Sequence, residues 1–151
     1  MTVAQALHWF ELAALYAEVE RVLRPAGVLA VWTYGVVHVA GASVDRLLQE
    51  FYCTTVQPYW PAERRHVESG YCTLSFPFAE LTPRAFQMQE DWSLPQFIGY
   101  TRSWSATARY VQQNGVDPAL LLEQSLQPEW GDPNSMRRIS WPLSLRIGVK
   151  P

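Results

Sequence analysis

The chain has 151 residues, of which 48% are hydrophobic and 17% charged, and 12 Lys and Arg against 14 Asp and Glu give a formal charge of -2. A chain of this length buries roughly 68–70% of the surface that its unfolded form exposes, so a single globular domain over residues 1–151 needs neither disulfides nor metals. Proteins that bind nucleic acids or anionic membranes carry clustered Lys and Arg. The near-neutral charge therefore predicts neither of these partners.

The cysteines and histidines do not form a recognisable site. Cys53 and Cys72 fit neither a paired metal-ligand spacing nor a disulfide framework, and His8, His38 and His66 are scattered along the chain. No signal-peptide pattern begins the sequence, and no apolar run approaches the ~18 residues of a membrane span. We expect no metal site, no membrane span and a reduced, cytoplasmic setting.

The first 34 residues predict a β-α-β unit. Apolar residues from Leu12 to Leu23 follow the helical period, with Glu11 in the first turn and a Pro-Ala-Gly stop at residues 25–27. Residues 28–34 are apolar at nearly every position, which is typical of a central parallel strand covered on both faces. A short strand within residues 2–7 would complete the unit.

The middle of the chain is harder to interpret. Ser43 is the expected N-cap of a second helix, whose apolar face begins at Val44 and which ends near Pro58. Residues 57–92 predict an excursion over the sheet, since they are rich in turn residues. Within them the even positions of residues 72–78 alternate as in a strand, and residues 86–92 form another possible strand.

Two helices and a strand are expected in the last third of the sequence. The third helix runs from about Pro95 to Asn114, with Gly115 in the C′ position, and a fourth begins at Asp117-Pro118. Residues 139–149 alternate strictly, which predicts a half-buried strand. Pro142 cannot donate to a ladder, so we expect a bend, a bulge or a sheet edge there.

Several runs of sequence resemble one enzyme family. AQALHWF at residues 4–10 and RVLRPAG at residues 21–27, followed by the strand at residues 28–34, resemble class I S-adenosylmethionine-dependent methyltransferases. Their combination is similar to the small-molecule branch that includes trans-aconitate methyltransferase-like proteins. Further matches lie at residues 59–61, 64–67, 76–78 and 99–105 and in the terminal strand.

The resemblance implies an α/β fold that is only half of the family's domain. We expect the C-terminal half of a Rossmann-like sheet, strands 4, 5, 7 and 6 with the last strand antiparallel, helices on its faces, and residues 57–92 over the acceptor side. The family holds its cofactor through a glycine-rich turn after strand 1 and an acidic residue after strand 2. No two of the eight glycines are separated by one residue, so the G-x-G turn is absent from this sequence.

The resemblance also implies a set of site residues. S-adenosylmethionine is the expected cofactor, and the residues expected to contact it follow the first strand: Ala4, Gln5, Ala6, His8 and Trp9. The acceptor-side candidates are Arg102, Tyr100, Trp104, Tyr34 and Arg64. A guanidinium suits a carboxylate acceptor because it can bind both oxygens. We assign no catalytic residue, since methyl transfer from a sulfonium depends on alignment more than on acid-base power.

Structural roles compete with these assignments. Trp9 could only fill the start of the first helix, and Arg64 with Arg65 could form a solvated pair beside Glu63. The aromatic stripes of the helices are more often part of a core than of a cofactor site.

Two functions remain open from the sequence. The first is a methyltransferase-like protein with a carboxylate or oxygen acceptor, inactive alone unless another chain supplies the glycine-rich half. The alternative is a non-catalytic homodimeric binding module that reuses the half-fold. The homodimer would form through the exposed edge of the first strand or by exchange of elements, because an unpaired strand edge tends to pair with another chain.

Overall fold

The computed structural model describes residues 1–151, which divide into two compact units. Unit 1 comprises residues 1–36, 62–88 and 141–151, and unit 2 comprises residues 37–61 and 89–140. The six strands are β1 (Thr2–Ala4), β2 (Val28–Tyr34), β3 (His38–Val39), β4 (Glu80–Leu81), β5 (Phe86–Trp92) and β6 (Arg137–Val149). Their hydrogen-bonded order is β1-β2-β6-β3, and β4 and β5 also pair with β6. This order, with β6 antiparallel to its neighbours, confirms the predicted fold class.

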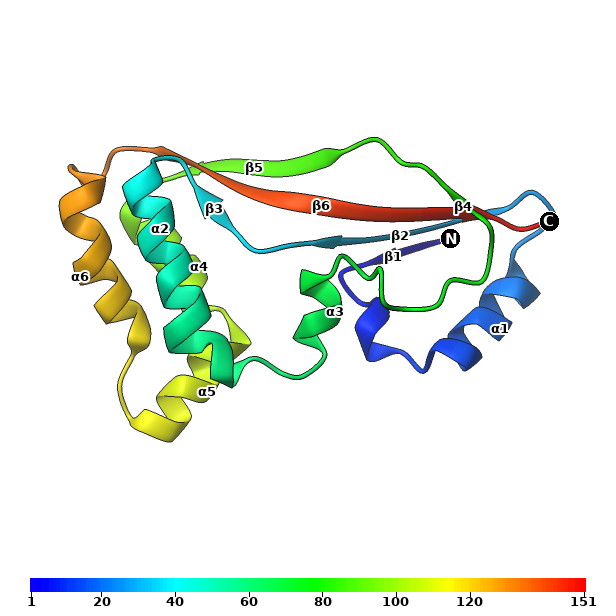
Figure 1. Ribbon diagram of the computed structural model, residues 1–151, viewed down its shortest axis with the longest axis horizontal. Helices are drawn as coiled ribbons and strands as arrows, with labels where there is room; N and C mark the ends of the chain where they lie inside the picture. The colour runs from blue at the N-terminus through cyan, green and yellow to red at the C-terminus, as the bar shows by residue number, and fades with distance from the viewer. The chain divides into compact units, whose positions relative to one another are not determined.

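Unit 1 begins with the predicted β-α-β unit. β1 pairs with β2 in parallel, and helix α1 (Leu12–Val22) connects them (Figure 1). The Glu11 carboxylate caps the start of α1 by accepting the N–H groups of Ala13 and Ala14 at 3.1 and 2.6 Å. At the other end, the Lys150 ammonium donates to the carbonyl of Leu23 at 2.8 Å. The two ends of the helix thus carry charges that complement its dipole.

β2 is the central strand of unit 1, as predicted, although it is parallel on one side only. Its other neighbour, β6, is antiparallel, and β4 continues the sheet beyond β6. Leu29, Val31 and Thr33 are fully buried on one face of β2, whereas the opposite face is half-buried. The buried core of this unit consists of Val3, Leu7, Val19, Leu29, Val31, Val67, Tyr71 and Phe78.

The prediction of a strand at residues 72–78 is wrong. This segment forms a series of turns, because an arginine side chain binds its carbonyls. The Arg146 guanidinium donates to the carbonyls of Tyr71 and Leu74 at 2.7 and 2.8 Å. It also binds both carboxylate oxygens of Glu80, at 2.8 and 2.6 Å, and lies 4.7 Å from the ring centroid of Phe76. Carbonyls that a strand would offer to a neighbouring strand are offered here to a side chain.

Unit 2 is mainly helical. Its helices are α2 (Ala42–Glu50), the π-helix η2 (Phe51–Val56), the 3-10 helix η3 (Gln57–Tyr59), α4 (Leu94–Arg102), α5 (Ser105–Asn114) and α6 (Pro118–Trp130). α6 packs against both α2 and α4 (Figure 1). The Asp117 carboxylate caps α6 and Gly115 adopts the left-handed conformation after α5, both as predicted.

Two helix predictions in unit 2 need correction. Ser43 is not the N-cap, because α2 starts at Ala42 and its N-cap is Gly41, whose carbonyl accepts the N–H of Asp45 at 2.9 Å. The helix expected over residues 95–114 is two helices, α4 and α5. The Thr107 hydroxyl donates to the Thr101 carbonyl at 2.7 Å, and Trp104 takes an extended conformation between the helices. A hydroxyl that competes for a backbone carbonyl favours such an interruption.

β6 confirms the predicted last strand and shows how it accommodates Pro142. The ladder with β3 ends at Ser140, and the ladder with β2 ends at Leu143. Pro142 lies between them, and its carbonyl accepts the N–H of Gly35 at 2.8 Å. The missing donor therefore falls between two ladders. No helix of the structure has both the length and the apolar character needed to cross a bilayer.

Substituting Arg146 by Met should lower the free energy of unfolding by about 2–3 kcal/mol, because buried carbonyls lose a charged donor. Denaturant unfolding measures this change. Arg21→Met is the matched control, since Arg21 pairs with Glu18 on an exposed surface and should make no measurable difference. Equal stability of Arg146→Met and the parent protein would contradict the role given to Arg146.

Candidate functional site

The carboxyl ends of β1 and β2 lie at one edge of unit 1. Because these strands are parallel, Gln5 to Trp9, which follow β1, and Tyr34, the last residue of β2, meet at this edge. The 3-10 helix η1 (Leu7–Trp9) contacts α3 (Arg64–Glu68) there. In open α/β sheets, ligands bind outside the carboxyl ends of the strands. This edge is the candidate site.

Gln5 is fixed at the site by its side chain. Its Oε1 accepts the Thr33 hydroxyl at 2.7 Å and the Tyr34 N–H at 2.9 Å, while its own N–H donates to the carbonyl of Trp32. Its φ of 51° places it in the left-handed region, which is uncommon for a residue other than glycine. Gln5 thus ties the end of β1 to the end of β2.

His8 and Tyr71 form the second polar pair. His8 Nδ1 lies 2.7 Å from the Tyr71 hydroxyl, and Tyr71 is fully buried. Tyr71 has a φ of 64°, so two of the three non-glycine residues with positive φ belong to this site. Backbone conformations of this kind cost about 1–3 kcal/mol and cluster at functional sites.

The electrostatics of the pair favour neutral side chains. Burial lowers the pKa of His8, and the positive charges of Arg64 and His66 lower it further, with Glu63 opposing them. Burial raises the pKa of the Tyr71 phenol, although the Thr33 side chain and the backbone of Leu7 and His8 act in the opposite direction. At neutral pH the site therefore combines an uncharged imidazole and phenol with the positive charge of the nearby Arg64.

Arg64 contributes to this site rather than to a solvated pair with Arg65. Its side chain is only 16% exposed and lies 3.7 Å from the Glu68 carboxylate, whereas Arg65 is exposed. Arg64 is also a positive charge felt by both His8 and Tyr71. A partly buried guanidinium beside two polar side chains is a suitable group for binding an anion.

The other predicted residues after β1 are more exposed. Trp9 is 62% exposed, so it does not merely fill the start of α1, and its ring centroid lies 4.6 Å from that of His8. Ala4 is exposed and Ala6 is half-buried. Trp9 provides an aromatic surface next to the polar pair.

The remaining candidates belong to unit 2, where they make structural contacts. Trp104 is 7% exposed and packs against Phe51, Tyr52, Trp60 and Tyr100, with ring centroids 5.6 to 6.4 Å apart. Arg102 donates to the Asp117 carboxylate at 2.8 Å and lies 3.8 Å from Glu123. Two carboxylates therefore already surround the guanidinium that was expected to bind an acceptor.

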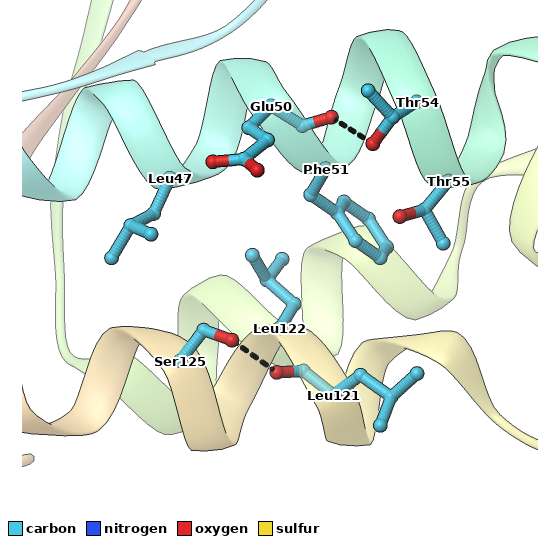
Figure 2. Close-up of a pocket in the computed structure, with 8 residues that line it drawn as sticks. All are labelled: Leu47, Glu50, Phe51, Thr54, Thr55, Leu121, Leu122 and Ser125. Atoms are coloured by element: carbon cyan, nitrogen blue, oxygen red, sulfur yellow. Dashed lines mark hydrogen bonds between the residues drawn. The ribbon is translucent and has the colours of Figure 1, made fainter.

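A pocket in unit 2 carries less chemistry than the strand-end site. It has a volume of about 180 Å³ and is lined by Leu47, Glu50, Phe51, Thr54, Thr55, Leu121, Leu122 and Ser125 (Figure 2). Its volume is below the ~300–1,000 Å³ of ordinary ligand pockets. Figure 2 shows that the Thr54 and Ser125 hydroxyls donate to the carbonyls of Glu50 and Leu121. Nowhere in residues 1–151 do three or more potential metal ligands cluster.

Sequence reasoning missed Tyr71 and Thr33. The sequence contains a signal for a functional role of Thr33. Thr33 places a hydroxyl within an otherwise apolar strand, and it shares its buried face with Val31 and Leu29. The sequence contains no such signal for Tyr71, because the place of Tyr71 depends on the turn at Gly70 and on Arg146, which lies 75 residues further along the chain.

Comparisons with known proteins point to methyltransferases. No family model matches the chain. A protein described as a putative methyltransferase of Dictyostelium discoideum is 30% identical over 128 residues, which are 83% of this chain and 49% of that protein. The structure of a putative type II methyltransferase from Anaeromyxobacter dehalogenans matches at a TM-score of 0.91 and 40% identity, over 98% of this chain.

The chain is methyltransferase-like in sequence and fold. It spans about half the length of the Dictyostelium protein and 63% of the Anaeromyxobacter chain. The methyltransferase resemblance therefore extends over nearly all of these 151 residues, while each relative has a further part that they do not match.

The stability of the protein should fall as the pH drops below about 6.5, in part because of His8. The folded-state pKa of His8 lies below its ordinary value of 6.5, so its contribution is complete above that pH and is lost as the pH falls toward the folded-state value. Denaturant unfolding at about pH 7.5 and about pH 5.5 should show a smaller loss for His8→Gln than for the parent, because Gln does not titrate. Equal losses would show that His8 is not perturbed.

Proposed function

We propose that the chain forms the acceptor side of an S-adenosylmethionine-dependent methyltransferase that acts on a small molecule with a carboxylate or another oxygen nucleophile. The single observation that supports this most is the group of Gln5, His8, Tyr71 and Arg64 at the carboxyl ends of two parallel strands, in a chain similar to methyltransferases over nearly its whole length. Positive charge at this edge suits an anionic acceptor.

The residues present fit only part of the methyl donor. The segment after β1 is the part of the chain expected to face the donor, and in Gln5 the side-chain oxygen is already used by Thr33 and Tyr34. No G-x-G turn occurs in residues 1–151, and Gly35 after β2 packs against the Pro142 ring. We therefore infer that most groups that hold the donor lie outside these residues.

Calorimetry with S-adenosylmethionine tests this directly. The 151-residue chain alone should show no micromolar binding if most groups that hold the donor lie outside these residues. It should gain methyl-transfer activity when a second polypeptide, corresponding to the unmatched part of the Anaeromyxobacter protein, is added. Micromolar binding by the chain alone would contradict the incomplete site. Failure of the completed enzyme to methylate any carboxylate or hydroxyl compound would contradict the function itself.

One structural observation favours a second candidate, a homodimeric binding module. The N–H of Ala30 donates to Met1 and the N–H of Gln5 donates to Trp32, so Met1 and Gln5 face β2. Backbone groups alternate along a strand, so those of Thr2 and Ala4 face the open side of β1. No other strand pairs with that side. Such an edge can pair with a second copy or with a separate chain that completes the enzyme.

Light scattering at high micromolar concentration should detect a dimer if the open edge of β1 joins two copies. Thr2→Pro removes an outward N–H and should shift the equilibrium to the monomer, because proline cannot donate to a ladder. Thr54→Ala is the control, since its hydroxyl donates to the Glu50 carbonyl within unit 2. A monomeric parent protein would eliminate the homodimer.

A further inference from the structure

The Tyr71 hydroxyl is hydrogen-bonded to the His8 ring, and the direction of this bond depends on which imidazole nitrogen carries the hydrogen. The Thr33 hydroxyl, also near Tyr71, gives its own proton to Gln5 Oε1, which the Tyr34 N–H holds in place. The hydrogen-bond partner of the Tyr71 hydroxyl is His8 Nδ1, at 2.7 Å.

A proton donated by Tyr71 to Nδ1 decides the state of the other ring nitrogen. In a neutral imidazole one nitrogen is a donor and the other an acceptor. If Nδ1 accepts from Tyr71, then Nε2 carries the hydrogen, and no hydrogen-bond partner occupies Nε2 in the structure. His8 is partly exposed, with the aromatic ring of Trp9 beside it.

We propose that Tyr71 is a positioning residue that fixes His8 with Nε2 protonated, so that the Nε2–H and the Arg64 guanidinium together bind a carboxylate of the acceptor. This inference rests on the proposed function and adds to it the role of His8 as a substrate donor, set by Tyr71. The charged or titratable groups that face His8 from α3 and its flank are Glu63, Arg64 and His66. Arg64, whose guanidinium lies 3.7 Å from the Glu68 carboxylate, supplies the positive charge next to His8 that would pair with a ligand of negative charge.

The backbone supports the same assignment of Tyr71. Its φ of 64° is maintained by the turn after Gly70 and by Arg146, which donates to the Tyr71 carbonyl at 2.7 Å. The hydrogen bond from Arg146 to the Tyr71 carbonyl orients Tyr71. The ion pair of Arg146 with Glu80 anchors the turn to β6. Tyr71 is therefore held in a strained conformation with its hydroxyl directed at His8.

Nitrogen-15 NMR of the histidine rings tests the positioning role without any methyl donor. The parent protein should show His8 with Nε2 protonated, and Tyr71→Phe should give a mixture of both tautomers, since the donor to Nδ1 is gone. Tyr16→Phe is the matched control, because its hydroxyl donates to the Ser75 carbonyl in the same unit, and it should leave His8 unchanged. A parent protein with Nδ1 protonated, or an unchanged tautomer in Tyr71→Phe, would overturn the proposal.

Binding of phenylacetate and phenylacetamide tests the ligand class. These probes share a ring that can lie against Trp9, and only the first is a carboxylate. We expect the carboxylate to bind about tenfold more tightly or better, as lost charged hydrogen bonds predict, with the preference reduced in Tyr71→Phe and in Arg64→Gln and kept in Tyr16→Phe. Equal affinity of the parent protein for both probes would refute the carboxylate site.

These results separate this proposal from the proposed function. A protonated Nε2 and a carboxylate preference, together with no methylation by the completed enzyme, would retain the site and reject the methyltransferase activity. Methylation of a carboxylate by an enzyme whose His8 has Nδ1 protonated would retain the activity and reject the role of Tyr71.

Discussion

The candidate site depends on the contacts that the Arg146 side chain makes. One guanidinium, 12% exposed, satisfies two carbonyls of the segment after Gly70 and binds both oxygens of Glu80. Without it, the turn that carries Tyr71 would have buried carbonyls with no donor, a cost of about 1–3 kcal/mol for each. Since Tyr71 in turn holds His8, an ion pair on β6 determines the geometry at the ends of β1 and β2.

The site combines regular and irregular structure. β1 and β2 are short and parallel, and their pairing fixes where Gln5 and Thr33 lie. The side chains that add chemistry, His8, Tyr71 and Arg64, come from a 3-10 helix, a turn and a five-residue helix. A rigid scaffold with ligand-binding groups on its connections is a common division of roles in α/β proteins.

The sequence predicts the regular elements well because they are encoded locally. α1, β2, α6 and β6 follow from hydrophobic periodicity and from caps such as Glu11 and Asp117. The errors occur where distant residues decide. Arg146 turns an alternating segment into loops, and the burial of Trp104 among aromatic rings interrupts a helical pattern. Of the candidate site, the resemblance predicts Gln5, His8 and Arg64, whereas the position of Tyr71 depends on contacts between distant parts of the chain.

The contacts of the Lys150 amine allow an experiment on local opening. It is the only lysine in the sequence, and its ammonium donates to the last carbonyls of α1 while its backbone pairs with Gly27. Its amine is thus tied to the packing of the first helix on the sheet. Acylating reagents would reach this amine most readily when the helix terminus loosens, so its rate of modification, followed apart from that of the Met1 α-amine, would report local opening in unit 1.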